Sequence, residues 1–449
     1  MDIQLYNTLS KTKETFKPLK VGIVSMYHCG PTVYDTPHIG NYRTFVMNDV
    51  VRRVFEYNSY QVIQAMNVTD VDDKTIRRSR EEGISLNALT RKYEKLFMEG
   101  ITSLNILTPH HLIRATEHIP SMIELIQTLL DKKIAYTTSD GVYMSIEKVK
   151  DYGALAHLKK TDISKERIAN DEYDKSNPHD FALWKFTTSD DVDNSWEAPF
   201  GKGRPGWHIE CSAMAMKVLG ETIDIHTGGN DLIFPHHTNE IAQSESATGK
   251  TFAHYWMHGA FMNVEEEKMA KSKGNFIKLE SLHDQMISPI AYRYWLLTAH
   301  YRSPVNFTYA AVQAAQSALI RLMGILANFP ENGVAIPFYT ERFNAFINDD
   351  LDTPKAIALI WDLIKDNRRS DADKRATIAD FDRVLGLNLS SIPHLVDEPT
   401  PPEIQALAEA REEARKNKEW DKADALRAEI EARGYTVLDS EKGFTVVRH

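Results

Sequence analysis

Cysteine is scarce in this chain, because 449 residues contain only Cys29 and Cys211. Two cysteines cannot build the disulfide framework that stabilises small secreted domains. In a reducing compartment, such residues are buried thiols, metal ligands or nucleophiles. From composition alone, the simplest interpretation is that both are buried as small apolar side chains.

Other features are also missing. The first twenty residues have no apolar core of a signal peptide, and no apolar run anywhere approaches the roughly 18 residues that a membrane span needs. We therefore expect a cytoplasmic protein without a membrane partner. The net charge of −10 argues against indiscriminate nucleic-acid binding, although it is compatible with a local basic surface. A chain of this length has room for two to four domains.

The first clear unit is a strand, a loop, a helix and a second strand. Residues 20–27 are an apolar run, residues 41–58 repeat valine at a spacing of four, and residues 60–69 are again strand-like. This order predicts a βαβ unit of a doubly wound, Rossmann-type parallel sheet. Ligands of such sheets bind beyond the carboxyl ends of the strands, where the loop 28–40 and the segment "TDVDDK" are expected.

The remaining chain divides by pattern into further units. Short strands and polar loops before residue 200 predict an insertion, and amphipathic helices after residue 305 predict a separate helical bundle. A proline-rich stretch then reads as a linker, followed by a helix pair and a hairpin. The predicted fold class is α/β with an inserted domain, an all-α bundle and a small α+β module. The expected boundaries are 1–95 and 200–300 (catalytic domain), 96–199 (insertion), 305–390 (bundle), 391–402 (linker) and 403–449 (terminal module).

Two histidine positions accompany the cysteines. His236 and Glu240 lie four residues apart in "FPHHTNEIAQSE", so on a helix they share one face. Two thiolates, an imidazole and a carboxylate fit the tetrahedral ligand set of zinc. His237, three residues from Glu240, is a rival ligand. Spacing alone leaves open an ordinary solvated helix face.

Two further segments have residues suited to a nucleotide. His38 to Asn41 stand where the first helix is expected to begin, a position that suits phosphate because backbone N–H groups and the helix dipole point outward. The loop 265–276 contains Lys268 and Lys271, and Gly274 can keep this loop mobile. It resembles a lid whose ammonium groups clamp a pyrophosphate. The plainer interpretations are a helix cap and a solvated basic loop.

These segments together resemble a known family. "HIGN" and "KMAKS" are similar to the HIGH and KMSKS motifs of class I aminoacyl-tRNA synthetases, in the expected order. "CGPTVYD", "NVTDVDDK", "GRPGWHIECSAMA", "FPHHTNEIAQSE" and "KMAKSKGNF" resemble cysteinyl-tRNA synthetases in particular. The similarity runs from about residue 4 to the end of the chain.

The resemblance implies a fold, an activity and a set of site residues. It implies a HUP-like Rossmann catalytic domain with an inserted connective domain, a bundle on the anticodon-stem side and a terminal anticodon-binding module. The implied reaction joins L-cysteine to the 3′ end of tRNA(Cys) through a cysteinyl-adenylate, using ATP with Mg²⁺, in a cytoplasmic monomer with one Zn²⁺. The implied zinc ligands are Cys29, Cys211, His236 and Glu240. The implied catalytic residues are His38, Asn41, Lys268 and Lys271. These catalytic residues also bind ATP, together with Gly40, Gly228, Gly229 and Asp231, and the residues implied to bind cysteine are Thr69 and Trp207.

Three positions depart from the family pattern. Asn41 replaces the second HIGH histidine, Ala270 replaces the first KMSKS serine, and Thr238 stands where many relatives have glutamate. An asparagine amide still donates to phosphate, and Ala270 spares both lysines, so we expect an active enzyme. Trp207 is expected to wall the amino-acid pocket, although an ordinary core tryptophan fits the sequence equally well.

The terminal helices are the expected RNA surface. Basic residues gather there, although interleaved glutamates also fit a charge-balanced surface helix. The residues concerned are Arg411, Arg415, Lys416, Lys418, Lys422, Arg427 and Arg433. Two alternatives stay open at this point: a related zinc-dependent ligase that joins cysteine to an amino sugar, and an inactive RNA-binding paralogue.

Overall fold

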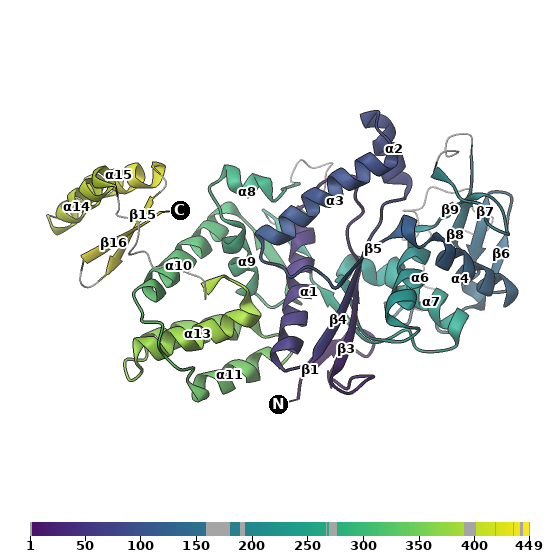
Figure 1. The fold of residues 1–449 in the computed structure, drawn as a ribbon, viewed down its shortest axis with the longest axis horizontal. Coiled ribbons are helices and arrows are strands. Elements are labelled where there is room, and N and C mark those ends of the chain that lie inside the picture. The colour runs from purple at the N-terminus through teal and green to yellow at the C-terminus, as the bar shows by residue number, and fades with distance from the viewer. Residues whose placement is uncertain are drawn as a thin grey trace.

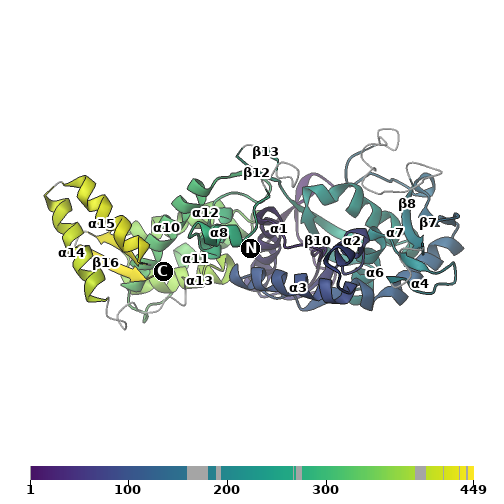
Figure 2. The same cartoon turned by 90° about the horizontal axis from the view of Figure 1, so that it is seen from above.

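The structure is a computed structural model that describes residues 2–158, 180–188, 194–265, 267–268, 276–389, 401–417, 419–433, 435–440 and 443–448. Four regions follow one another along its long axis. The inserted domain lies at one end, then the parallel sheet, then the helical bundle, and the C-terminal module lies at the other end (Figures 1 and 2). The Lys271 prediction and residues 391–400 of the predicted linker lie outside the described residues.

A five-stranded parallel sheet forms the centre of the molecule. Its strand order is β11-β10-β3-β4-β5, and every neighbouring pair is parallel. The chain therefore winds in one direction from β3 through β4 to β5 and in the other direction to β10 and β11. The reversal lies between β3 and β10, where a doubly wound sheet binds its ligands. The strands are β3 (Ile23–His28), β4 (Gln61–Val68), β5 (His111–Arg114), β10 (Ile223–Gly229) and β11 (Ala253–Gly259).

Helix α1 (Ile39–Tyr57) connects β3 to β4 and packs on the sheet. Its valines at a spacing of four, Val46, Val50 and Val54, are all buried, as the sequence predicted. Burial of this apolar stripe, rather than intrinsic propensity, stabilises a helix rich in β-branched residues. The other helices around this sheet are α2 (Asp73–Glu82), α3 (Leu86–Ser103), α6 (Trp207–Leu219) and α7 (Thr238–Thr248).

The inserted domain is an antiparallel sheet of order β6-β7-β8-β9, accompanied by α4 (Ile119–Asp131). Its strands are β6 (Ala135–Thr137), β7 (Gly141–Met144), β8 (Phe181–Phe186) and β9 (Gly203–Pro205). The expected boundaries differ from this arrangement at both ends. Strand β5 falls inside the range 96–199 but pairs with β4 of the parallel sheet, and β9 lies beyond that range. Near the N-terminus, β1 (Gln4–Asn7) pairs with β2 (Thr12–Thr15).

Helices dominate the chain after the parallel sheet. The bundle contains α8 (Glu280–Asp284), α9 (Pro289–Leu297), α10 (Tyr309–Ala327), α11 (Pro337–Ile347), α12 (Thr353–Lys365) and α13 (Asp371–Leu385). A small sheet joins β12 (Met262–Val264), β13 (Glu267–Lys268) and β14 (Val305–Phe307). The terminal module has α14 (Pro402–Lys416), α15 (Trp420–Ala432), β15 (Tyr435–Ser440) and β16 (Gly443–Arg448), which are the predicted helix pair and hairpin.

Helix α10 is long and apolar enough in composition to cross a membrane. The sequence analysis did not identify this segment because polar residues such as Arg321 interrupt its apolar residues. In the structure α10 packs against α9, and its buried residues Val312, Leu319 and Leu322 belong to the main core. A core helix passes the same test of length and composition, so this one helix is weak evidence for a membrane segment.

A buried arginine joins the parallel sheet's first helix to the bundle. Arg293 of α9 is fully buried and donates to Asp49 of α1 at 2.5 Å and to the Leu385 carbonyl of α13 at 2.7 Å. Its Nη1 also donates to the Leu104 carbonyl at 3.1 Å. The guanidinium is thus satisfied by three separate parts of the chain, which a buried charge requires.

The buried histidine of β3 predicts an acid-sensitive fold. Burial, together with the charges of His226 and Arg52, lowers the pKa of His28 to about 3. The unfolded chain takes up this proton below about pH 6.5, whereas the folded protein does not until about pH 3. Stability therefore falls as the pH drops, by about 2 kcal/mol between pH 6.5 and pH 5 from this residue alone.

Urea unfolding at those two pH values measures this effect in wild type and in His28→Gln. We expect the variant to lack the histidine's share of the pH dependence. His254→Gln, at an exposed position of β11, is the matched control and should keep the wild-type dependence. Equal pH dependence in all three proteins would refute the assignment to His28.

Candidate active site

The sheet reversal brings the predicted residues into one cavity. This cavity has a volume of about 400 Å³ and lies at the carboxyl end of β3 and β10. It is lined by the loop after β3, the start of α1, the segment after β10, Trp207 and Phe276. The predicted site residues that line it are Cys29, His38, Asn41, Trp207, Gly229 and Asp231.

His38 and Asn41 form a reciprocal cap at the start of α1. The Asn41 backbone N–H donates to His38 Nδ1 at 3.2 Å, and the His38 backbone N–H donates to Asn41 Oδ1 at 3.1 Å. Since Nδ1 accepts, the neutral imidazole carries its proton on Nε2. The oxygen of the Asn41 amide is used by the cap, which leaves its NH₂ group as the donor for a ligand. The cap interpretation and the phosphate interpretation are therefore compatible.

The segment after the lysine loop is attached to this helix start. The Ile39 backbone N–H donates to the Ile277 carbonyl at 2.9 Å, and the Phe276 ring packs edge-on against His38 with centroids 4.8 Å apart. Lys278 pairs with Asp35 at 3.1 Å. The chain that follows the loop is thus held beside the cavity. The side chain of Lys268 and all of Lys271 lie outside the described residues.

Four predicted metal ligands gather beneath the cavity. Cys29 follows β3 and Cys211 lies on α6. His236 lies in the helical turn Ile233–His237 that precedes α7, and Glu240 lies in the first turn of α7. All four ligand atoms lie within 4.8 Å of one another. The two sulfurs are 3.8 Å apart. Two zinc–sulfur bonds of about 2.3 Å at a tetrahedral angle separate their sulfurs by about 3.8 Å. The spacing of these side chains therefore fits a zinc ion.

The buried imidazole of His236 gives independent support for a ligand. One ring nitrogen, Nδ1, is 2.9 Å from Nδ1 of His208, which orients the ring. The other, Nε2, has no hydrogen-bond partner among the described residues although His236 is 1% exposed, and it lies 3.1 Å from Glu240 Oε1. An orphaned buried nitrogen that faces a carboxylate is typical of a metal-binding histidine.

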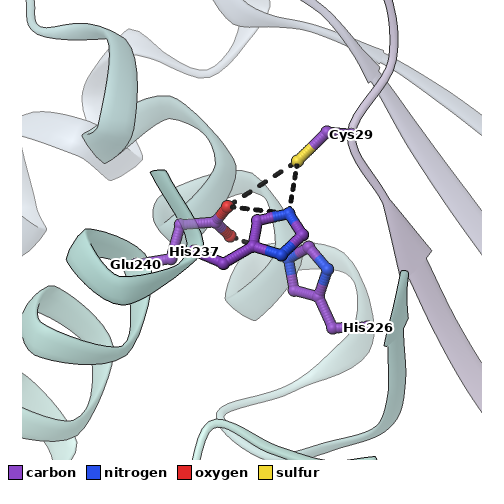
Figure 3. A group of neighbouring side chains, drawn as sticks. All are labelled: Cys29, His226, His237 and Glu240. Carbon is purple, nitrogen blue, oxygen red and sulfur yellow. Dashed lines mark hydrogen bonds and ion pairs between the residues drawn. The ribbon is translucent and has the colours of Figure 1, made fainter. Parts of the chain in front are cut away.

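A second set of four residues competes for the same ion. Cys29, His226, His237 and Glu240 also bring their ligand atoms within 4.8 Å of one another. Figure 3 shows the Cys29 sulfur facing both the Glu240 carboxylate and the His237 ring, with His226 on the other carboxylate oxygen. Because both sets share Cys29 and Glu240, they describe one ion. The set with Cys211 supplies two sulfurs, which zinc favours.

The charges within this cluster reinforce one another. Burial raises the pKa of Glu240, but His226 and His236 outweigh it and lower that pKa to about 2. Burial likewise lowers the pKa of His236, but Cys211 and Glu240 outweigh it and raise that pKa to about 10. Burial lowers the pKa of His237 well below its ordinary value, so this imidazole is neutral. The pair His236 and Glu240 thus carries opposite charges when no ion is bound.

The two ligand sets predict different results for two neighbouring substitutions. We expect His236→Gln to lower the bound metal from about one ion per chain to less than a tenth of that, because it removes a ligand. We expect His237→Gln, the matched control, to retain most of the metal with an affinity about ten- to a hundredfold lower, because it removes only a neighbour of Cys29. Metal analysis of the purified proteins measures both. The reverse order would assign the ion to His226 and His237 instead.

The predicted cysteine-binding residues adjoin this cluster. The Thr69 hydroxyl donates to Glu210 Oε2 at 2.9 Å, and both residues are buried. The Trp207 ring lies over His236, with centroids 4.3 Å apart, and is 36% exposed into the cavity. Trp207 is therefore a wall of the cavity rather than the core tryptophan that the sequence also allowed.

The two glycines of β10 have different neighbours. A Cβ at Gly228 would lie 2.6 Å from His237 Cε1, and one at Gly229 would lie 2.4 Å from Asp231 Oδ1. Close packing against a buried histidine is thus what excludes a side chain at Gly228. Gly229 and Asp231 line the cavity, whereas Gly228 is buried beside His237.

Comparisons with known proteins agree with this geometry. Residues 15–317 match the family model of the class I (C) tRNA synthetase catalytic domain, and residues 397–446 match that of the cysteinyl-tRNA ligase anticodon-binding domain. The chain belongs to the cysteinyl-tRNA ligase family. A cysteine–tRNA ligase 1 of Burkholderia lata is 43% identical over 99% of this chain and 96% of its own length. A cysteine–tRNA ligase of Methanosarcina mazei is 43% identical over 98% of each chain.

Solved structures resemble this member of the cysteinyl-tRNA ligase family in fold. A methionyl-tRNA synthetase of Mycobacterium tuberculosis bound by methionyl-adenylate has a TM-score of 0.60 at 15% identity, over 86% of this chain and 95% of that one. A leucyl-tRNA synthetase of Agrobacterium radiobacter has a TM-score of 0.60 at 11% identity, over 86% of each. These likenesses confirm the predicted Rossmann-type fold class and helical C-terminal half.

Several site residues of this family member escaped the sequence analysis. His208 holds His236, His226 contacts Glu240 at 2.8 Å, and Glu210 holds Thr69. Burial raises the pKa of Glu210 well above its ordinary value, and its Oε1 has no partner among the described residues. The available signal was a polar residue within an apolar run, as in "TIDIHTGG" and "WHIECSAM", which marks a buried polar group.

The terminal helices are less basic in effect than their sequence indicated. Arg411 is only 5% exposed, which differs from the exposed position expected of a phosphate contact. Other cations pair with the interleaved glutamates, as Lys422 does with Glu419 at 3.1 Å and Arg427 with Glu431 at 2.9 Å. Lys418 lies outside the described residues. The charge-balanced interpretation therefore describes these helices better than a continuous cationic face.

Proposed function

We propose that this chain joins L-cysteine to the 3′ end of tRNA(Cys) through a cysteinyl-adenylate. The observation that carries the proposal is the placement of a thiol-rich ligand cluster directly beneath a cavity that begins at the His38–Asn41 helix start. This arrangement brings a group able to recognise sulfur next to a group able to bind phosphate. It occurs in a chain that belongs to the cysteinyl-tRNA ligase family throughout its length.

Cys29, Cys211, His236 and Glu240 are the proposed ligands of one Zn²⁺, because their spacing and the orphaned His236 nitrogen fit it. A zinc ion held by these residues would supply a soft Lewis-acid site that favours the thiolate of cysteine over the uncharged hydroxyl of serine. A pocket that reads shape alone separates such near-isosteres by only about 1–3 kcal/mol. The ligand cluster is therefore the proposed source of amino-acid selectivity.

Trp207 and Thr69 are proposed to orient the amino acid above the cluster. The Trp207 ring covers His236 and limits the pocket on one side, which excludes larger side chains. The Thr69 hydroxyl donates its proton to Glu210 and accepts from the Asn67 amide at 3.2 Å, so one oxygen lone pair remains to accept a hydrogen bond from the substrate ammonium group. Both residues act by positioning the carboxylate for attack.

In the first step, the adenylyl group of ATP is transferred to cysteine within the cavity. The cysteine carboxylate attacks the α-phosphate of ATP and displaces pyrophosphate, and Mg²⁺ accompanies the triphosphate as part of the substrate. His38, through Nε2–H, and the Asn41 NH₂ group are the proposed donors to the charge that develops on phosphate. Lys268 and Lys271 are the proposed cations for the leaving pyrophosphate. Gly40, Gly229 and Asp231 are proposed to lie around the nucleotide, and Gly228 to let β10 pack against His237 behind it.

In the second step, the terminal ribose hydroxyl of tRNA attacks the acyl carbon of the adenylate and AMP leaves. We propose that the parallel sheet, including β5, and its helices contribute the catalytic domain, that the β6-β7-β8-β9 sheet with α4 is the connective insertion, and that residues 305–449 are the RNA-binding half. A cytoplasmic location and a monomeric state remain expectations from the resemblance. The match of residues 397–446 to an anticodon-binding domain favours an RNA acceptor over the amino-sugar acceptor of the related ligase.

The decisive experiment compares the two acceptors directly. Purified protein is given ATP and cysteine with either a tRNA(Cys) transcript or a glucosamine-type amine, and the attached cysteine is measured. We expect attachment to the RNA alone, together with ATP–pyrophosphate exchange that depends on cysteine. Attachment to the amine alone would favour the amino-sugar ligase, and absence of any exchange would favour the inactive paralogue.

A further inference from the structure

A second, smaller groove opens beside the main cavity. It has a volume of about 200 Å³ and is lined by Tyr34, Asp35, Lys74, Arg77, Arg78 and Glu81. Tyr34 and Asp35 line both this groove and the main cavity, so the two are continuous at these residues. The other four residues lie on α2, which follows β4 at the carboxyl edge of the sheet (Figure 1).

The charge of the groove is positive. Three cations, Lys74, Arg77 and Arg78, face two carboxylates, Asp35 and Glu81. Both carboxylates already have cationic partners, since Lys278 pairs with Asp35 at 3.1 Å and Arg78 with Glu81 at 3.5 Å. Lys74 and Arg77 are exposed to solvent. The lining cations outnumber the lining carboxylates by one, so the groove favours an anion, and the adenylate chemistry described above does not use it.

The groove also has a fixed position and an aromatic wall. Asp73 at the start of α2 pairs with Lys185 of β8 at 2.5 Å and with Arg204 of β9. These contacts hold α2 between the parallel sheet and the inserted domain. Lys74 Nζ lies 5.7 Å from the centroid of the Tyr34 ring, so a cation and an aromatic face stand together where the groove meets the cavity.

We propose that this α2 groove binds the single-stranded 3′ end of the RNA acceptor as it enters the cavity; the proposal rests on the proposed function. Its physical basis is that single-stranded nucleic acid is held by cations along its phosphates and by aromatic faces against its bases. Lys74 and Arg77 contact phosphates, and Tyr34 stands where a base reaches the cavity. ATP has its own site at the start of α1, on the other side of Tyr34 and Asp35.

The test removes two charges and keeps the side-chain lengths similar. We expect the double variant Lys74→Gln/Arg77→Gln to raise KM for tRNA(Cys) roughly tenfold at moderate salt and to reduce the salt slope of log KM by about 1.4, for two lost contacts to a single strand. Cysteine-dependent ATP–pyrophosphate exchange, in which neither side chain is assigned a role, should change by less than about twofold. The control, Lys95→Gln/Lys250→Gln, removes two charges whose side chains are 79% and 62% exposed elsewhere, and should leave both activities unchanged.

A binding cycle locates the contact on the RNA. Dissociation constants are measured for wild type and the double variant with intact tRNA(Cys) and with the same RNA lacking its single-stranded 3′ end. Truncation should weaken binding to wild type but have little further effect on the variant, since the two changes remove one interaction. Equal losses on truncation in both proteins, or a raised KM for ATP in the variant, would overturn the proposal. A wild type that charges no RNA would instead refute the proposed function, and the binding cycle would still test the groove.

Discussion

Replacing Cys211 by serine is expected to abolish metal binding and to lower cysteine-dependent ATP–pyrophosphate exchange by roughly a hundredfold or more. Cys211 is 1% exposed, and its sulfur lies 3.8 Å from that of Cys29. A serine hydroxyl there stays protonated at neutral pH and cannot replace a thiolate ligand. The preference for cysteine over serine should fall with the metal, because the remaining pocket distinguishes them only by shape.

Metal content and exchange with both amino acids are measured on the same preparation. Ser212→Ala is the matched control, since it removes a buried hydroxyl at the next position of α6, which donates to Gln243 at 2.6 Å. That variant should retain about one ion per chain and its discrimination. If Cys211→Ser and the equivalent Cys29→Ser kept full discrimination against serine, the assignment of selectivity to this cluster would be wrong.

Asn41→Asp is expected to lower kcat/KM for ATP by roughly a hundredfold while the protein remains as stable as wild type. An aspartate oxygen accepts from the His38 backbone N–H as the asparagine oxygen does at 3.1 Å, so the helix cap survives. The substitution removes the NH₂ donor and places a negative charge beside the triphosphate. Activity and stability should therefore separate in this variant.

Steady-state exchange at varied ATP, together with urea unfolding, measures the two effects. Asn87→Asp makes the same substitution at an exposed position in the first turn of α3, outside the cavity, and should leave both quantities near wild type. An Asn41→Asp enzyme with normal kinetics would show that Asn41 only caps the helix. A large loss of stability would show that the cap depends on the amide group itself.

Local patterns predicted the elements that carry the site, and they failed where distant segments meet. The valine spacing of α1, the strand before Cys29 and the terminal helix pair were all evident from periodicity. The choice between His236 and His237 was not, because both lie within four residues of Glu240, and in the structure both rings lie close to the Cys29 and Glu240 side chains. The structure adds a physical reason for His236, namely its orphaned Nε2.

The boundary of the insertion was misjudged for a similar reason. Strand β5 has only four residues and follows two helices, so nothing in its own sequence shows that it pairs with β4 rather than with the inserted sheet. Glu210 and His226 were missed because a single polar residue in an apolar run identifies burial but not its partner. The partners of buried polar groups depend on which distant segments the topology brings together, and the periodicity of a local sequence does not predict this.

The burial of Arg293 has a consequence for how this enzyme can be divided. The match to the catalytic domain ends at residue 317, but one of the acceptors of the Arg293 guanidinium is the Leu385 carbonyl of α13. A fragment cut at the end of that match would leave a hydrogen-bond donor of a buried cation without its acceptor. Helix α13 thus packs against α1 and supplies an acceptor to a buried cation of α9, so the structural unit extends beyond the end of the catalytic-domain match.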